Sequence, residues 1–343
     1  MNQKLLPEWI EQSGVMLTWP HKHGWTELLD EADQTFTEIA KVITLYEKIL
    51  ISHYDAAHKA YILKLLENEN IDLTKVNFAK AKSNDIWVRD NGPLTVQMEN
   101  GSLKLLSFSF NAWGGKYPHK DDANLCTTVY KQEFFGNNPM ELVDFVLEGC
   151  AIEVDGNGSL LTTESVMLNG GRNNLARADI EKVLKREFGV DRILWLKSGG
   201  LLGDDTDGHI DTLARFLDGE TICYVSCDDP TDKQYEGLKD MKRELHAMRT
   251  LDGKPYRLIA LPLPDPQFSP AGLRLPATYA NFFLINGALL MPIYGAQQDA
   301  EAVHTIKSYA TERTVHAVNC RTLIHFYGSL HCATMQLPKG VLS

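Results

Sequence analysis

The stretch "EVDGNGSLLTT", residues 153–163, places an Asp-Gly turn between two runs of residues that favour extended backbone. Asp-Gly and Asn-Gly between such runs are strong signals for a β-hairpin, because both turn residues tolerate positive φ. The same signal recurs in "MENGSLKLL" (98–106) and "RFLDGETICYV" (215–225). The chain is therefore predicted to contain several antiparallel strand pairs joined by tight turns.

Amphipathic helical patterns separate these strand pairs along the whole chain. Helices are predicted at residues 26–46, 56–68, 176–188, 231–248 and 299–312, with a weaker pattern at 122–134. Further extended runs are predicted at residues 48–54, 75–81, 103–110, 192–196, 222–226, 256–263, 281–294 and 321–328. Strand pairs interleaved with single helices indicate an α/β protein that is neither a strict β-α alternation nor a segregated α+β layout. No linker-like segment divides the chain, so residues 1–343 are predicted to form one domain.

The composition is that of a globular protein with an acidic surface. Of 343 residues, 44% are hydrophobic, and 45 acidic against 34 basic residues give a formal charge of −11. This balance disfavours nucleic acid and anionic membranes as partners and slightly favours a small cationic ligand. Without a secretory leader pattern or a membrane-spanning apolar run, the chain is predicted to be cytoplasmic, and association into homo-oligomers is left open. Six cysteines without paired spacing favour reduced thiols: Cys126, Cys150, Cys223, Cys227, Cys320 and Cys332.

Four segments carry ionisable residues and glycines where the pattern predicts the ends of core strands. They are "NDIWVRDNGP" (84–93), "LEGCAIEVDGNG" (147–158), "GDDTDGHIDTLARF" (203–216) and "GSLHCATMQLP" (328–338). Such positions are typical of side chains that project into a site. A metal centre is not predicted. An EF-hand register on Gly208 would need ligands from Gly203 and Ala214, and His209 and Asp211 lack a partner with zinc-ligand spacing.

Cys332 has two interpretations. A free cysteine is most often a small buried hydrophobe, but here it lies among polar residues and is also a candidate nucleophile. If the segment is extended, His331 and Cys332 point to opposite faces, so the base must come from elsewhere in the chain. His331 is therefore predicted to pack or hydrogen-bond away from the reaction.

Taken together, one cysteine, one histidine and three carboxylates fit chemistry on a guanidinium group. In isolation each has an ordinary structural interpretation, such as a salt bridge beside Arg89 or a hydrogen-bonded core histidine. In combination, two carboxylates can hold the planar cation through paired hydrogen bonds while a thiolate attacks its central carbon. The histidine then protonates the departing nitrogen and later activates water. The candidates are Cys332, His209, Asp90, Asp211 and Glu148.

Eight motifs spread along the chain carry a family resemblance. They are "LTWPHKHGW" (17–25), "WVRDNGP" (87–93), "SFNAWGG" (109–115), "LEGCAIEVDGNGSLLTTE" (147–164), "LNGGRN" (168–173), "GDDTDGHIDTLARF" (203–216), "YANFFLINGALLMPIYG" (279–295) and "GSLHCATMQLP" (328–338). In this order they resemble the agmatine deiminase family, also called the bacterial peptidylarginine deiminase-like family, within the guanidino-modifying pentein superfamily. The resemblance implies an α/β fold, a five-bladed pseudo-symmetric α/β propeller of ββαβ units.

The resemblance also implies a function and a set of site residues. It implies hydrolysis of a guanidino substrate, agmatine first among the choices, through a covalent S-amidino-cysteine and without a metal or other cofactor. Six residues match the family's site: Cys332 as nucleophile, His209 as general acid/base, Asp90 and Asp211 as guanidinium ligands, Glu148 as a further acid, and Trp87 along the substrate's alkyl chain. A histidine that changes protonation state between two half-reactions is expected to keep a pKa near its ordinary value.

Three departures from the family pattern leave the identity of the substrate open. Cys150 stands where the family usually has the second glycine of Glu-Gly-Gly, the loop over residues 114–124 is short, and "GSLHCAT" replaces the commoner "GNIHCIT". Deimination of arginine or peptidyl-arginine, amidino transfer to an amine, and a non-catalytic propeller scaffold remain alternatives. A papain-like hydrolase is disfavoured because His209 precedes Cys332 and the paired aspartates would have no role.

Overall fold

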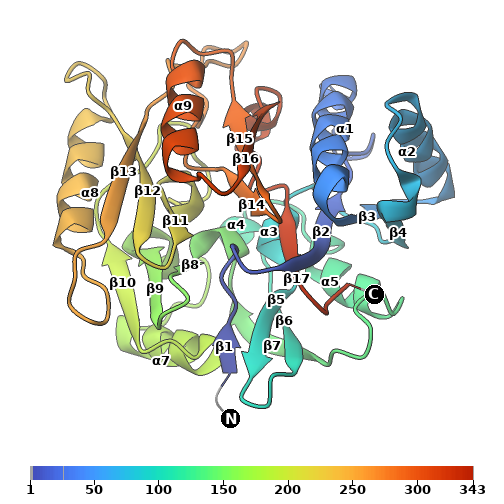
Figure 1. The fold of residues 1–343 in the computed structure, drawn as a ribbon, viewed down its shortest axis with the longest axis horizontal. Coiled ribbons are helices and arrows are strands. Elements are labelled where there is room, and N and C mark those ends of the chain that lie inside the picture. Colours follow the sequence, from blue (N-terminus) through green and yellow to red (C-terminus); the bar gives the residue numbers. More distant parts are fainter. Residues whose placement is uncertain (1–2, 26, 343) are drawn as a thin grey trace.

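The computed structural model describes residues 3–25 and 27–342, and within these residues the strands form five small sheets. The sheets surround the middle of the molecule, and the long helices lie toward its outside (Figure 1). The first residue of the helix predicted at 26–46 lies outside this description, as do the two ends of the predicted 1–343 domain.

Each sheet combines an antiparallel strand pair with a parallel partner. The first is β1 (Gln3–Leu5), β5 (Leu94–Met98), β6 (Leu103–Ser109) and β7 (Met140–Val146); the second is β10 (Arg192–Leu196), β9 (Ser159–Thr163) and β8 (Glu153–Val154). The third is β11 (Ala214–Asp218), β12 (Thr221–Ser226) and β13 (Arg257–Pro262); the fourth is β14 (Phe283–Ile285), β15 (Ala288–Ile293) and β16 (Thr314–Asn319). The fifth is β17 (Met335–Pro338), β2 (Gln12–Thr18), β3 (Lys48–His53) and β4 (Val76–Lys80).

A helical segment precedes the parallel strand of each sheet. The helices are α1 (Leu29–Tyr46), α2 (Ala56–Asn68), α3 (Val88–Asn91), α4 (Ala112–Gly115), α5 (Leu125–Tyr130), α6 (Glu164–Met167), α7 (Arg177–Phe188), α8 (Tyr235–Ala247) and α9 (Asp299–Tyr309). For example, α7 connects β9 to β10, α8 connects β12 to β13, and α9 connects β15 to β16. The five ββαβ units confirm the predicted fold class, a five-bladed α/β propeller.

Local sequence accounts for most element boundaries. The β8–β9 and β5–β6 hairpins turn at Gly156 and Gly101, which have φ of 68° and 82°. Helix α2 begins after Asp55, whose side chain accepts a 2.8 Å hydrogen bond from the backbone of His58. Helix α7 ends at Gly189 in the left-handed conformation, with φ of 60°.

The prediction of a strand at residues 321–328 is wrong. These residues form a 3₁₀ helix, η5 (Leu323–Phe326), and the strand of this unit is the preceding β16. Leu323 and Ile324 are fully buried, and the Phe326 ring stacks on Trp25 with a centroid distance of 3.6 Å. Tyr327 then takes a φ of 71°, which no strand residue adopts. Packing against the core has overridden a local preference for extended backbone.

The two ends of the chain close the ring of sheets. Strand β17, near the C-terminus, pairs antiparallel with β2, near the N-terminus, and Met335 lies opposite Met16 (Figure 1). Among the described residues, no helix has the length and apolar character needed to cross a bilayer.

Candidate active site

The predicted site residues lie in the segments that lead from one sheet to the next. These segments are α3 with Asp90; Glu148 with the 3₁₀ helix η3 (Gly149–Ala151); His209 with the 3₁₀ helix η4 (Ile210–Thr212), which contains Asp211; the approach to β14 with Asn281; and the turn at residues 330–333 with Cys332. Helix α3 packs on η3, and η3 packs on η4. Each segment that connects two neighbouring sheets therefore contributes residues to a single cluster.

Cys332 is buried, with 5% of its surface exposed, and it lies in a turn rather than in an extended segment. Its carbonyl accepts a 3.2 Å hydrogen bond from the backbone N–H of Arg89. Its Sγ lies 3.4 Å from Asp211 Oδ2 and 3.3 Å from Asn281 Nδ2. Hydrogen bonding with Cys150 lowers the pKa of the Cys332 thiol, but burial and the charge of Asp211 outweigh this, and the net effect is a raised pKa.

The prediction that His331 lies away from the reaction is wrong. Its Nδ1 lies 2.8 Å from Asp211 Oδ2, the same oxygen that faces the Cys332 thiol, and its Nε2 lies 2.8 Å from Glu8 Oε2. The error came from assuming an extended backbone, which would have turned the two neighbouring side chains apart. In the observed turn, His331 instead contacts the carboxylate that faces the Cys332 thiol.

Asp211 is fully buried and held in a fixed position. Its Oδ2 accepts hydrogen bonds from His331 Nδ1 and, at 3.0 Å, from Asn281 Nδ2. Burial alone would raise the pKa of Asp211, but the hydrogen bond and charge of His331 bring it down to about 2. The other oxygen, Oδ1, is buried and has no protein hydrogen-bond partner. Asp211 thus presents an ionised, unused acceptor.

Asp90 is the second buried carboxylate predicted to hold a guanidinium. Trp113 Nε1 donates to its Oδ2 at 2.9 Å, and the backbone N–H of Cys150 donates to its Oδ1 at 3.1 Å. Burial raises the pKa of Asp90 to about 7, and the nearby charges of Glu148 and Asp211 act in the same direction. A cation placed beside Asp90 would relieve this cost.

His209 lies between two carboxylates, with 1% of its surface exposed. Its Nδ1 is 3.9 Å from Asp90 Oδ1, and its Nε2 is 4.0 Å from Glu148 Oε2. Burial lowers the pKa of His209 to about 3, although Asp211 opposes this shift, so the imidazole is neutral at pH 7. The expectation of a pKa near the ordinary value is therefore wrong for this site. Nε2 is also buried without a protein partner.

Glu148 is paired with a cation that the sequence prediction did not include. Arg172 Nε contacts both Glu148 oxygens, at 2.8 and 2.9 Å, and Arg172 Nη1 binds Asp207 at 2.8 Å. Both members of the Glu148–Arg172 pair are almost completely buried. Glu148 was predicted to face a substrate nitrogen or the histidine, and the structure shows the histidine within 4.0 Å.

Two further predicted residues have largely structural surroundings. Trp87 is buried at the start of α3, 6.2 Å from the Trp25 ring, and packs so closely on Gly328 that a side chain there would collide with the indole. Arg89 donates from Nε to the Thr334 carbonyl at 2.8 Å, which ties α3 to the segment that follows Cys332. A structural role for Arg89 agrees with its sequence interpretation.

Loops at the edge of the site are tied to one another. Lys116 Nζ lies 3.0 Å from Asp207 Oδ1, and the Tyr117 hydroxyl donates to Asp205 Oδ2 at 2.7 Å. These contacts join the segment after α4 to the loop that leads into His209. Asp207 also binds Arg172, so three segments are linked beside the catalytic cluster.

Cys150 adds a second thiol to the cluster. Its Sγ and ligand atoms of Asp90 and His209 lie within 4.8 Å of one another, as do the ligand atoms of Cys150, Asp211 and Cys332. Thiolate, imidazole and carboxylate at such spacing are able to bind a soft divalent ion. Apart from Cys150, however, these are the groups that the predicted guanidinium chemistry requires.

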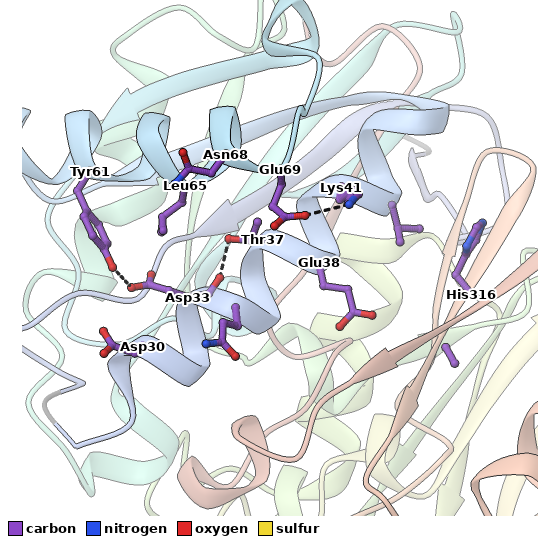
Figure 2. Close-up of a pocket in the computed structure, with 13 residues that line it drawn as sticks. Asp30, Asp33, Thr37, Glu38, Lys41, Tyr61, Leu65, Asn68, Glu69 and His316 are labelled. Atoms are coloured by element: carbon purple, nitrogen blue, oxygen red, sulfur yellow. Dashed lines mark hydrogen bonds and ion pairs between the residues drawn. The ribbon is translucent and has the colours of Figure 1, made fainter.

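A separate groove lies between α1 and α2 and has a volume of about 740 Å³. Figure 2 shows the side chains that line this groove, with Asp33 facing Tyr61. Both carboxylate oxygens of Asp33 accept hydrogen bonds from the protein. Trp19 Nε1 donates to one at 2.6 Å, and the Tyr61 hydroxyl donates to the other at 2.8 Å. The groove shares no lining residue with the cysteine-histidine cluster, and its central carboxylate holds elements together.

Comparison with known proteins gives one consistent family. A model of the Porphyromonas-type peptidyl-arginine deiminases matches residues 4–338. An agmatine deiminase of Stutzerimonas stutzeri is 31% identical, covering 96% of this chain and 94% of the relative. A solved substrate-bound agmatine deiminase of C. jejuni is 36% identical with a TM-score of 0.90, covering 99% of this chain and 97% of that chain. A solved Porphyromonas gingivalis protein, provisionally assigned as an arginine deiminase, is 40% identical with a TM-score of 0.94, covering 99% and 100%.

Proposed function

Because this chain belongs to the Porphyromonas-type peptidyl-arginine deiminase family, we propose that it hydrolyses agmatine to N-carbamoylputrescine and ammonia. The observation that carries the proposal is the meeting of Cys332, His209, Asp90 and Asp211 in one buried cluster. Two atoms of these groups, Asp211 Oδ1 and His209 Nε2, are buried without a hydrogen-bond partner among the described residues, which is costly unless a ligand supplies one.

The substrate guanidinium is held by two carboxylates. It donates paired hydrogen bonds to Asp90 and Asp211, and its permanent charge offsets the repulsion between them. The same charge lowers the pKa of the Cys332 thiol, which burial and Asp211 otherwise raise. Binding and activation of the nucleophile are thereby coupled, and the positions of the groups supply orientation and electrostatic stabilisation.

In the first half-reaction Cys332 attacks the guanidinium carbon. Its proton passes to neutral His209, and the resulting thiolate forms the S–C bond. The imidazolium then protonates the departing nitrogen, the C–N bond breaks, and ammonia leaves. The enzyme now carries a positively charged S-amidino group on Cys332, and His209 is neutral again.

In the second half-reaction water replaces the sulfur. Neutral His209 removes a proton from water, and the oxygen attacks the same carbon. The S–C bond breaks, the sulfur regains a proton from His209, and the product leaves with an uncharged ureido group. The remaining proton is taken up by ammonia, which is released as ammonium.

The tied loops favour a small substrate over a peptide. Contacts from Lys116 and Tyr117 to the 205–207 loop close the edge of a site in which Cys332 is already buried. Arginine would present an α-carboxylate, and Arg172 and Lys116 are both engaged by protein carboxylates. We further place the enzyme in the cytoplasm, because all six cysteines are unpaired, which suits a reducing compartment.

The test is a parallel assay with agmatine, arginine and an arginine-containing peptide. Ammonia release and the mass of the ureido product are measured for the purified protein and for Cys332→Ala. Release from agmatine alone, lost in the variant, is the expected result. Release from arginine or the peptide would keep the mechanism and overturn the substrate. Release that requires an added amine acceptor would indicate amidino transfer, and no release from any guanidine would overturn the proposed enzyme.

A further inference from the structure

The thiol of Cys150 lies beside the nucleophile, and the proposed reaction does not use it. Cys150 is fully buried in η3, and its Sγ, the Cys332 Sγ and a carboxylate oxygen of Asp211 lie within 4.8 Å of one another. Both cysteines are free. The two sulfurs come from connections that are far apart in the sequence, so only the fold brings them together.

The backbone on each side of the pair is anchored. The N–H of Cys150 donates to Asp90 Oδ1 at 3.1 Å, and the N–H of Cys332 donates to Asn281 Oδ1 at 3.4 Å. A disulfide requires the two sulfurs, which now lie within 4.8 Å of each other, to approach to about 2.05 Å. Closure of the pair therefore needs the two sulfurs to move toward each other from anchored segments.

We propose that Cys150 and Cys332 form a disulfide when the protein is exposed to peroxide. The Cys332 sulfur attacks one peroxide oxygen, the O–O bond breaks, and Cys332 becomes a sulfenic acid as one water leaves. The Cys150 sulfur then attacks the Cys332 sulfur, the S–O bond breaks, and a second water leaves. Two thiols supply the two electrons that reduce the peroxide.

The disulfide occupies the sulfur that the reaction needs. Oxidised protein therefore cannot attack a guanidinium, and a thiol reductant restores it. Trapping the sulfenic acid also prevents further oxidation to the sulfinic acid, which such reductants do not reverse. Because burial and Asp211 raise the pKa of both thiols, little thiolate is present and the oxidation is slow.

The test compares wild-type protein with Cys150→Ala and with the matched control Cys320→Ala. Cys320 is also fully buried and follows β16, so its removal tests whether any buried thiol would serve. Each protein is treated with excess hydrogen peroxide and then with dithiothreitol. Peptides are mapped by mass spectrometry without reduction after the first step, and agmatine turnover is measured after both.

We expect wild type and Cys320→Ala to yield a linked peptide pair containing Cys150 and Cys332, to lose activity, and to regain nearly all of it with dithiothreitol. We expect Cys150→Ala to accumulate Cys332 sulfinic acid and to stay inactive after reduction. Absence of the linked pair from oxidised wild type, or a pair joining Cys320 to Cys332, would overturn the proposal, whatever the variants do.

The loss of activity rests on the proposed function, but the linked peptides do not. If the pair forms and agmatine is not turned over by reduced protein, the disulfide stands and the proposed function fails. If agmatine is turned over and no pair forms, the reverse holds.

Discussion

Two groups of buried charged side chains lie next to each other in this molecule, and they differ in how far their charges are matched. The first, the closed network, consists of Glu8, Arg89, Glu153 and Arg215. Glu8 Oε2 lies 2.9 Å from Arg215 and 3.2 Å from Arg89, and Arg215 contacts Glu153 at 2.6 Å. Burial alone would raise the pKa of Glu8, but Arg215 and His331 hold it well below its ordinary value.

The second group, the open cluster, consists of Asp90, Asp211, His209 and Cys332. Within residues 3–25 and 27–342, its carboxylates face no arginine or lysine at ion-pair distance. His331 joins the two groups through Glu8 and Asp211, and both contacts are hydrogen bonds when both ring nitrogens carry a proton. The protein therefore supplies cations to one group and leaves the other to be completed by a cationic substrate.

Removing one carboxylate of the open cluster tests whether that group works through charge. Asp211→Asn keeps the shape but loses the charge that faces the guanidinium. We expect kcat/KM for agmatine to fall by roughly 10²–10⁴-fold, since breaking a buried ion pair costs about 3–5 kcal/mol. Steady-state kinetics check this, with the exposed Asp218→Asn as control. Equal losses in both variants would contradict the assignment.

The closed network is expected to act on stability. Glu8→Gln leaves Arg89 and Arg215 short of a buried partner, so we expect the free energy of unfolding to fall by about 3–5 kcal/mol. Urea denaturation measures this. The matched control is Glu69→Gln, which breaks an exposed pair with Lys41 and should cost under about 1 kcal/mol. If Glu8→Gln lowered the free energy of unfolding as little as the control does, the closed network would not be distinguished from the open cluster by its effect on stability.

The open cluster should carry a stability cost that depends on pH. The pKa of Asp90 is raised from 3.8 to about 7 on folding, so the folded state binds this proton more tightly and stability falls as the pH rises through that range. Asp90→Asn cannot ionise. The difference in unfolding free energy between Asp90→Asn and wild type should therefore shift in favour of the variant by on the order of 3 kcal/mol from pH 4 to pH 8. The variant should also lose activity.

Denaturation curves of both proteins at several pH values measure this difference. A constant offset between the two proteins would show that Asp90 titrates as it does in the unfolded chain.

The smallest effect is expected from a single donor to the open cluster. Trp113→Phe removes the Nε1–H that binds Asp90 and keeps most of the ring. We expect a loss of roughly tenfold in kcat/KM, since one hydrogen bond to a charged group contributes about 1.5 kcal/mol. The same hydrogen bond lowers the pKa of Asp90, so the rise of kcat/KM with pH should move to higher pH. An unchanged pH profile would place Trp113 outside the site's electrostatics.

Local signals in the sequence were sufficient to predict the hairpins and the long helices. They were insufficient where contacts with distant parts of the chain determine the local structure. The Asp-Gly turn near residue 156 predicted its hairpin because the turn geometry depends on adjacent residues alone. Residues 321–328 favour extended backbone locally, and only burial of Leu323 and Ile324 turns them into a 3₁₀ helix.

The site divides in the same way. Cys332, His209 and the carboxylates were found because a known chemistry and a set of motifs require those residue types together. Asn281 and Arg172 lie within quoted motifs, as polar residues in apolar or glycine-rich surroundings, yet their partners are distant in sequence. The arrangement of the five sheets brings Arg172 to Glu148 and His331 to Asp211, and the local sequence does not predict either contact.

The pairing of β17 with β2 also bears on how the protein is made. Synthesis proceeds from the N-terminus, so β2 is complete long before its neighbour β17 exists, and the other sheets can form in between. Cys332 is carried by the segment that leads into β17, and it is therefore synthesised after the other four connections between the sheets. A nascent or prematurely terminated chain can hold Asp90, Glu148 and His209 and still lack the nucleophile. Synthesis of the segment that carries Cys332 thus completes the set of connections that form the candidate site.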